Sequence, residues 1–272
     1  MFVYRQIGRV GYYYSTLLYS KNAFSTRIGG APDSETAGLN LAHGRGDDDA
    51  TVLENLKQYA SAAGFDPERV ISLPQIHSTD VLYVTENDAG RGYFRPADGD
   101  GDGYVTDCEG VTLGVKSADC VPVLLEARDA QGRVLAVSAV HAGWKGTAGG
   151  IVPNAVRALR ELCKEDVSIY AAIGPCIGAC CFEVGSDCVE VFEQNLGADT
   201  VQKCFESAGN GKYFGDLIKV NRILLQDAGV SDEQIDAANL CTCCNPEDFF
   251  SHRYAVKHTS GKRGTMLSVI WK

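Results

Sequence analysis

Two histidines and one cysteine lie where strand-like runs of the sequence end. His77 stands in the segment LPQIHS, Cys120 in SADCVP and His141 in VHAGWKGT. Because the ends of neighbouring strands open on a shared crevice, we expect these three side chains to meet there. Two imidazoles and one thiolate suit zinc by softness and by geometry. The residue types therefore predict a metal site built from His77, Cys120 and His141.

A zinc ion with three protein ligands keeps a fourth tetrahedral position for water or substrate, as catalytic zinc sites do. Such an ion lowers the pKa of a bound water to about 7, which supplies hydroxide at neutral pH. We expect Asp119 and Gln75 to orient the two imidazoles by accepting hydrogen bonds from them. The alternative is that His77, Cys120 and His141 are unrelated core or surface residues, because their spacing matches no local zinc motif.

The elements that position these residues are predicted from apolar periodicity. Helices are expected over residues 48–63, 150–164 and 217–228. Strand-like runs cover residues 70–73, 80–85, 111–116, 121–127, 134–140, 168–173 and 265–271. This order predicts an α/β fold, with α+β as the alternative, built on a mixed sheet with outer helices. Since no repeat or low-complexity linker divides the chain, we expect a single metalloenzyme domain over residues 1–272.

The charge and hydropathy of the 272-residue chain bear on its partners. The formal net charge is −10 and the Lys and Arg residues are scattered, whereas nucleic-acid binding needs a basic patch or stripe. No apolar run approaches the ~20 residues of a membrane helix, and the start of the chain lacks the apolar core of a signal peptide. We therefore expect a cytoplasmic protein that binds neither nucleic acid nor membrane. The sequence does not indicate its oligomeric state.

Eleven cysteines are an odd number, and without an export signal they predict free thiols that mostly pack as small buried hydrophobic residues. Two groups stand out, Cys176, Cys180, Cys181 and Cys188, and Cys241, Cys243 and Cys244. Because the groups do not show a pair of CxxC motifs, we expect structural thiols there and not a second zinc site. Cys176 near His252 is an alternative nucleophile, but no sequence neighbour supplies a base, which favours a structural role.

Two glycine-rich loops carry charged residues. Asp98, Asp100, Asp102 and Glu109 fit the ligand positions of an EF-hand calcium loop. Glycine and proline upstream would break the entering helix and a strand-like run follows, so we expect an acidic loop and not a calcium switch. Arg27 lies between Ser-Thr and Gly-Gly, a setting in which a basic side chain holds phosphate or carboxylate. The alternative for Arg27 is a surface arginine.

Many motifs in one order resemble the laccase-domain family, also called the multicopper polyphenol oxidase or purine nucleoside phosphorylase family. They are FSTRIGG, LNL, GDD, QIHS, DGYVT, ADC, HAGW, IGPCIG and FSHR, and they span nearly the whole chain. The resemblance implies that His77, Cys120 and His141 are catalytic and bind zinc, with copper as the alternative metal. The candidate substrate-binding residues in or beside these motifs are Arg27, Asn40 and Lys145.

The resemblance also implies an enzyme that acts on purine nucleosides. It implies phosphorolysis of adenosine, inosine, guanosine or methylthioadenosine and deamination of adenosine, with nucleoside and phosphate as partners. Lys145 stands where the family commonly has arginine, which keeps the charge but loses the bidentate fork. Three alternatives stay open: an amidase that edits a peptidoglycan precursor, a copper polyphenol oxidase, and a metal-stabilised binding protein without turnover. The five histidines are few for a multicopper oxidase.

Overall fold

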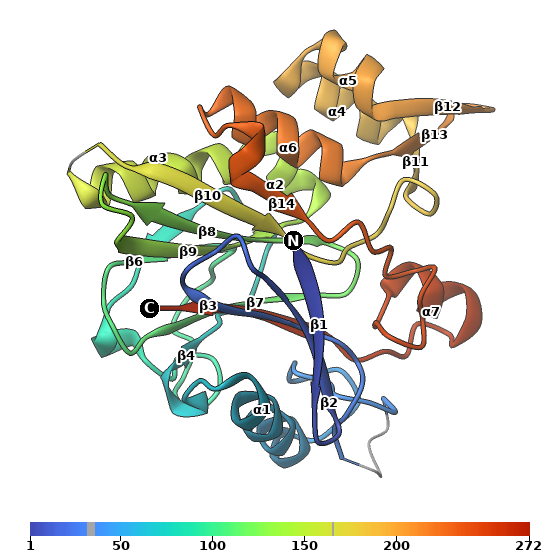
Figure 1. Ribbon diagram of the computed structural model, residues 1–272. Helices are drawn as coiled ribbons and strands as arrows, with labels where there is room; N and C mark the ends of the chain where they lie inside the picture. The colour runs from blue at the N-terminus through green and yellow to red at the C-terminus, as the bar shows by residue number, and fades with distance from the viewer. Residues whose placement is uncertain (32–35, 165) are drawn as a thin grey trace.

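Two six-stranded sheets pack against each other between layers of helices (Figure 1). The computed structural model describes residues 1–31, 36–164 and 166–272. The first sheet contains, in order, β1 (Phe2–Ile7), β2 (Val10–Ser15), β3 (Lys21–Ser25), β15 (Met266–Trp271), β7 (Thr112–Ser117) and β4 (Val70–Ile71). The second contains β14 (Ile235–Ala237), β10 (Ser168–Ile173), β8 (Val121–Arg128), β9 (Val134–Ala142), β6 (Gly103–Thr106) and β5 (Val81–Tyr83). Parallel pairs join antiparallel ones in each, so both sheets are mixed.

Apolar residues on both faces of each sheet hold the layers together. Between the sheets, Leu113 and Ile270 of the first sheet share a buried cluster with Leu124 of the second. On the other face of the first sheet, α1 (Asp49–Ala63) contributes Tyr59 and its neighbours to a separate cluster. Each such buried side chain stabilises the fold by roughly 1.5–3 kcal/mol relative to exposure. The sheets are therefore fixed face to face, which brings their strand ends to one region.

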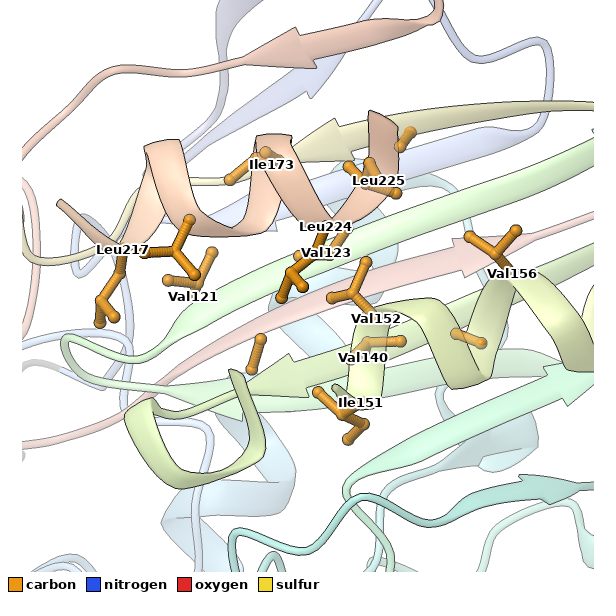
Figure 2. Close-up of a cluster of buried hydrophobic side chains, with 14 of the residues drawn as sticks. Val121, Val123, Val140, Ile151, Val152, Val156, Ile173, Leu217, Leu224 and Leu225 are labelled. Carbon is orange, nitrogen blue, oxygen red and sulfur yellow. The ribbon is translucent and has the colours of Figure 1, made fainter. Parts of the chain in front are cut away.

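The other face of the second sheet is covered by α3 (Ile151–Cys163) and α6 (Leu217–Asp227) (Figure 2). Val152 of α3 and Leu224 of α6 lie in one buried cluster with Val123 of β8. The branched side chains of these strands fill the space under both helices. Helices thus cover both outer faces of the sandwich, and the predicted α/β class with outer helices is confirmed.

The predicted helices and strands are confirmed, with small changes at their ends. α1 begins after Asp48, whose side chain accepts a hydrogen bond from the Thr51 N–H, and it ends at Gly64 in the left-handed conformation. α3 and α6 lie within the predicted ranges 150–164 and 217–228. β4 and β5 are shorter than predicted. Each is the edge strand of its sheet and therefore pairs with a neighbouring strand on one side alone.

The structure contains two mixed sheets where we expected one. Consecutive strands β7 and β8 belong to different sheets, and an apolar pattern does not distinguish which partner a strand will choose. Elements that the sequence did not predict include a three-stranded sheet of β11 (Glu183–Gly185), β13 (Lys212–Gly215) and β12 (Phe205–Gly209). They also include α2 (Trp144–Gly149), α4 (Ser186–Leu196), α5 (Ala198–Cys204), α7 (His252–His258) and the 3₁₀ turns η1 (Pro67–Arg69), η2 (Glu86–Asp88) and η3 (Asp232–Gln234). In the described parts of the chain, every helix is too short or too polar to cross a bilayer.

A buried ion pair ties the two sheets together at one end. Glu126 of β8 is fully buried and pairs with Arg128. Its two carboxylate oxygens accept hydrogen bonds from the backbone N–H groups of Tyr19 and Ser20, in the turn between β2 and β3. Arg128 lies between the rings of Tyr19 and Tyr170, 3.5 and 3.6 Å from their centroids. The second sheet thereby anchors a turn of the first.

We predict that Glu126→Gln lowers the free energy of unfolding by about 3 kcal/mol, because it leaves the buried Arg128 charge uncompensated. Urea denaturation followed by far-UV circular dichroism measures this change. Glu190→Gln, on the exposed face of α4, is the matched control and should change the value by less than about 0.5 kcal/mol. Equal effects of the two substitutions would show that the buried pair does not stabilise the fold.

Candidate metal centre

The three predicted ligands meet at one point between the sheets' strand ends. His77 lies in the loop between β4 and β5, Cys120 directly before β8, and His141 near the end of β9. Their ligand atoms all lie within 4.8 Å of one another, and the two imidazole ring centroids are 4.9 Å apart. His141 is buried, Cys120 is half-buried and His77 is exposed. The group is therefore reachable from solvent on the His77 side.

The carboxylate of Asp102 holds this arrangement together. Its two oxygens accept hydrogen bonds from three consecutive backbone N–H groups, those of Ile76 at 3.0 Å, His77 at 3.0 Å and Ser78 at 2.9 Å. The same carboxylate accepts the Nδ1–H of His141 at 2.8 Å. For the loop to curl around it, His77 adopts a left-handed conformation with φ of 62°. One buried side chain thus fixes both the loop that carries His77 and the ring of His141.

The pKa values at the site reflect this hydrogen bonding. Burial raises the pKa of Asp102, but the hydrogen bonds from His141 and from the Ser78 N–H outweigh it and lower the pKa to about 2. Burial lowers the pKa of His141, but the Cys120 sulfur and Asp102 raise it to about 9. Burial and the neighbouring His141 lower the pKa of His77. The surroundings of His141 therefore favour a positive charge, which a metal ion can supply in place of a proton.

The donor set fits a metal ion. Because His141 Nδ1 donates to Asp102, its Nε2 keeps a lone pair for a ligand bond, and this pairing is typical of metal-bound imidazoles. Gly143 leaves the room that His77 needs, since a Cβ at this position would lie 2.1 Å from His77 Nδ1. Two nitrogens and one sulfur suit zinc, and copper also binds imidazole and thiolate. The group is a candidate site for one such ion.

Our prediction for the residues that orient the imidazoles was wrong. Gln75 pairs with the backbone N–H and C=O of Lys116, both at 2.7 Å. Asp119 accepts hydrogen bonds from the Thr242 hydroxyl at 2.7 Å and from the Arg253 N–H at 2.6 Å. Gln75 therefore ties its loop to β7, and Asp119 holds the segments that carry Thr242 and Arg253. Asp102 is the residue that orients His141. The sequence did not identify this role because the acidic pattern around Asp102 resembles a calcium loop.

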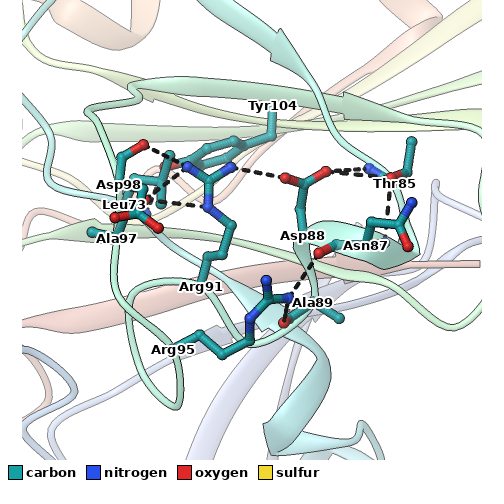
Figure 3. A network of polar contacts seen from close by, with 10 residues as sticks. All are labelled: Leu73, Thr85, Asn87, Asp88, Ala89, Arg91, Arg95, Ala97, Asp98 and Tyr104. Carbon is teal, nitrogen blue, oxygen red and sulfur yellow. Dashed lines mark hydrogen bonds and ion pairs between the residues drawn. The ribbon is translucent and has the colours of Figure 1, made fainter.

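The loop that leads to Asp102 is not an EF-hand, as expected. It runs from the 3₁₀ turn η2 into β6, and no α-helix adjoins it in the described residues. Figure 3 shows how Arg91 holds it, by an ion pair to Asp88 and hydrogen bonds to the carbonyl groups of Ala97 and Asp98. The Tyr104 hydroxyl also donates to the carbonyl of Gly101. These contacts fix the backbone that directs Asp102 toward the candidate metal ligands.

Two cavities of different character adjoin the ligands. The first, of about 420 Å³, contains His77, Cys120 and His141 in its wall together with the basic residues His43, Arg45, Lys116 and Arg263. The second, of about 470 Å³, shares His77 and Cys120 and is lined by apolar groups that include Trp144, Ile177 and Phe182. Arg263 lies in both walls, and His252 lies in the second. The candidate metal centre is therefore at the border of a basic cavity and an apolar one.

The basic cavity gathers positively charged groups of the kind that suit an anion. Burial, and then the charge of Arg45, lower the pKa of Lys116 to about 8, and its ammonium donates to the carbonyl of Ser72 at 3.0 Å. Burial and Arg45 also lower the pKa of Arg263. The Nε–H of Arg263 is buried and has no hydrogen-bond partner among the described residues. Cations that repel one another beside an unpaired donor are stabilised when an anion binds between them.

The structure does not bring the three predicted substrate-binding residues to these cavities. Of the residues that it describes, those lining the two cavities do not include Arg27, Asn40 or Lys145. Arg27 donates to the carbonyl groups of Pro246, Thr36 and Ala37. Asn40 is fully buried, and its amide bonds to neighbouring loops, while Lys145 is exposed at the start of α2. Their role in substrate binding stays a prediction. Lys116 and Arg263 were not predicted from the sequence, because neither belongs to a recognisable local motif.

Our prediction that most cysteines are buried was wrong. All eleven lie in described parts of the chain, and those in the buried class are Cys176, Cys188 and Cys204. Cys176 is enclosed in the main core cluster, which supports the structural role over the nucleophile. The ligand atoms of four others lie within 4.8 Å of one another, namely Cys180, Cys181, Cys241 and Cys244. Cys241 and Cys244 form a single CxxC motif, which predicts a metal site less strongly than a pair of such motifs would.

Fold and site together define a class of protein: an α/β sandwich with a candidate metal centre of two histidines and one cysteine beside two cavities. Residues 21–272 match the family described as multi-copper polyphenol oxidoreductase laccase. The chain belongs to this laccase-domain family, as the sequence motifs indicated.

Several relatives cover most of the chain. It is 36% identical over 251 residues to a protein of Geobacillus stearothermophilus named purine nucleoside phosphorylase YlmD, covering 90% of this chain and 88% of the relative. It is 35% identical over 246 residues to a protein of an unknown prokaryotic organism named adenosine deaminase RL5, covering 85% and 87%. The crystal structure of YlmD from Geobacillus stearothermophilus matches the fold with a TM-score of 0.85 at 31% identity, covering 99% and 98%.

We predict that Asp102→Asn weakens zinc binding by roughly 10- to 100-fold, because the residue that orients a metal-bound imidazole loses its charge. Competition with a chromophoric chelator measures this affinity. Asp98→Asn is the matched control, since the Asp98 backbone and not its carboxylate holds the loop. If Asp102→Asn binds zinc as tightly as the unmodified protein does, Asp102 does not organise the site.

Proposed function

We propose that this protein is a zinc-dependent purine nucleoside enzyme that carries out both phosphorolysis of nucleosides and deamination of adenosine. The observation that carries the proposal is the position of His77, Cys120 and His141 between a basic cavity and an apolar one. The two substrates differ as the two cavities do. A nucleoside has an apolar base that can stack, and phosphate is charged. The names of the relatives, purine nucleoside phosphorylase and adenosine deaminase, support both activities.

In this proposal, the purine occupies the apolar cavity. Trp144 and Phe182 offer aromatic surface to the base, and Ile177 adds apolar contact. Besides the candidate ligand His77, this wall contains the imidazole of His252, and burial and the charge of Arg263 lower the pKa of His252. A mainly neutral imidazole at neutral pH can exchange a proton with the purine ring, so we assign this role to His252. The ribose would then lie beside the metal ligands.

Phosphate occupies the basic cavity, where Lys116, Arg45 and Arg263 surround it. In phosphorolysis a phosphate oxygen bonds to the anomeric carbon as the carbon–nitrogen bond breaks, and the purine takes the electron pair and a proton. In deamination water replaces the amino group at the purine six-position, and ammonia leaves. A zinc ion, when bound by His77, Cys120 and His141, supplies Lewis acidity and lowers the pKa of water. The basic groups share a cavity wall with His77, Cys120 and His141, so phosphate bound there would lie close to a ribose beside those residues.

The proposal is tested by incubating the purified protein with adenosine, with and without phosphate, and separating the products. We expect inosine in both cases, and ribose 1-phosphate with free base when phosphate is present. Cys120→Ala should lose the zinc ion held by His77, Cys120 and His141, and with it both activities. Turnover confined to a peptidoglycan precursor would favour the amidase, turnover confined to a phenol the oxidase, and no turnover the binding protein. Each of these results would contradict the proposal.

The two reactions should separate by mutation, because phosphate enters one of them alone. Arg263→Ala should raise the apparent KM for phosphate by roughly 10- to 150-fold, since a lost charge-assisted contact costs about 1.5–3 kcal/mol. Lys116→Ala should act in the same direction, and deamination should fall much less in both variants. Steady-state kinetics of both reactions on the same preparations measures the split. Lys262→Ala, exposed and next in sequence, is the control.

Arg27→Ala tests the sequence-based prediction in the same experiment. Arg27 holds three carbonyl groups, so we expect its loss to lower stability more than it changes the KM for phosphate. If Arg27→Ala raises the KM for phosphate and Arg263→Ala does not, the anion binds at the glycine-rich turn and the basic cavity has another role.

A further inference from the structure

Four cysteines outside the proposed active site form a second cluster of metal-binding type. The sulfur atoms of Cys180, Cys181, Cys241 and Cys244 all lie within 4.8 Å of one another. The Cys244 sulfur is 3.4 Å from the sulfurs of both Cys180 and Cys181. Four thiolates around a zinc ion at about 2.3 Å stand about 3.8 Å apart, so the observed spacing fits a tetrahedral site. We propose that these four cysteines bind a structural zinc ion, independently of the proposed function.

The fold brings the cluster together from two distant segments. β10 and β14 are parallel neighbours, and each leads into one of the loops that carry the cysteines (Figure 1). Backbone pairing continues past the strands, because the Cys176 N–H donates to the carbonyl of Leu240 and the Thr242 N–H donates to the carbonyl of Cys176. The loops therefore leave the sheet side by side. One supplies Cys180 and Cys181, and the other supplies Cys241 and Cys244.

Gly178 contributes the close contact that such a site needs. Its backbone N–H donates to the sulfur of Cys241 at 3.2 Å, and a hydrogen bond of this kind favours the thiolate form. A Cβ at position 178 would lie 3.1 Å from the Cβ of Cys241 and 3.3 Å from the sulfur of Cys180. Glycine is thus the residue that lets the first loop approach the second. Cys241 and Cys244 have the CxxC spacing that is common in zinc sites.

The chemistry of the cluster indicates zinc in a structural role. Four soft sulfur ligands in tetrahedral arrangement select zinc or iron–sulfur chemistry over hard cations. With four protein ligands no position remains for water, which distinguishes the cluster from the three-ligand centre at Cys120. Cys180 and Cys244 are exposed, so an ion can enter from solvent.

The cluster also supports the wall of the active site. The first loop donates the Ile177 N–H to the carbonyl of Asp119, and the second donates the Thr242 hydroxyl to its carboxylate. Arg253 links them, because its guanidinium donates to the carbonyl of Cys181 and its N–H to the Asp119 carboxylate. Asp119 directly precedes Cys120. A zinc ion that joins the two loops would therefore fix the backbone that presents Cys120.

Metal analysis of protein purified without chelator tests the proposal. We expect about two zinc ions per chain in the unmodified protein, and about one in Cys244→Ser and in Cys120→Ala, because each removes a different site. Cys108→Ser, outside both clusters, is the control and should keep both ions. If Cys120→Ala alone changes the metal content, the four-cysteine site does not exist, whatever the fate of the proposed function.

A second measurement covers the case in which Cys244→Ser fails to fold. X-ray absorption of the zinc that remains in Cys120→Ala should show sulfur neighbours alone, at about 2.3 Å. Nitrogen or oxygen neighbours, absence of zinc, or a disulfide between Cys244 and Cys180 or Cys181 found by mass spectrometry would overturn the proposal. We further expect Cys244→Ser to melt about 5 °C or more below Cys108→Ser, because metal binding of this kind contributes directly to folding stability.

Discussion

The candidate active site depends on one buried carboxylate. Asp102 accepts the N–H groups of Ile76, His77 and Ser78 and the imidazole N–H of His141, so four donors converge on two oxygens. Such a group is costly to bury unless its bonds are satisfied, and here they are. Its negative charge then favours a cation at the ligands it orients. The same carboxylate fixes the backbone at His77 and the ring orientation of His141. The shape of the loop and the direction of the candidate ligands therefore depend on one residue.

Charge is distributed unevenly around this centre. The chain is acidic overall, with a net charge of −10, yet Lys116, Arg45 and Arg263 gather in one cavity wall. Trp144 and Phe182 line the neighbouring cavity, so the centre separates a charged compartment from an apolar one. In the function that we propose, this division gives a nucleoside and phosphate different places to bind. The four-cysteine cluster adjoins the apolar wall along the chain, because Phe182 of that wall directly follows Cys181.

Much of the fold and part of the site could be predicted from the sequence. Helices α1, α3 and α6 have apolar residues at helical spacing and recognisable ends, and these local signals held. His77, Cys120 and His141 were found because their residue types match a metal and their motifs match a family. Lys116 and Arg263 carry no local pattern, and long-range folding alone makes them neighbours. Asp102 was noticed only as part of an acidic loop that fits a calcium pattern. Its role could not be predicted, because a sequence does not show which backbone N–H groups a carboxylate will accept.

The central claim is that Asp102 organises a metal centre at His77, Cys120 and His141. Diffraction from crystals of the zinc-loaded protein, recorded on both sides of the zinc absorption edge, tests it most directly. We predict an anomalous peak bonded to the Cys120 sulfur, one nitrogen of His77 and Nε2 of His141, with His141 Nδ1 still donating to Asp102. A peak-free site in fully zinc-loaded protein, or an ion bound through His141 Nδ1 with Asp102 turned away, would contradict the account.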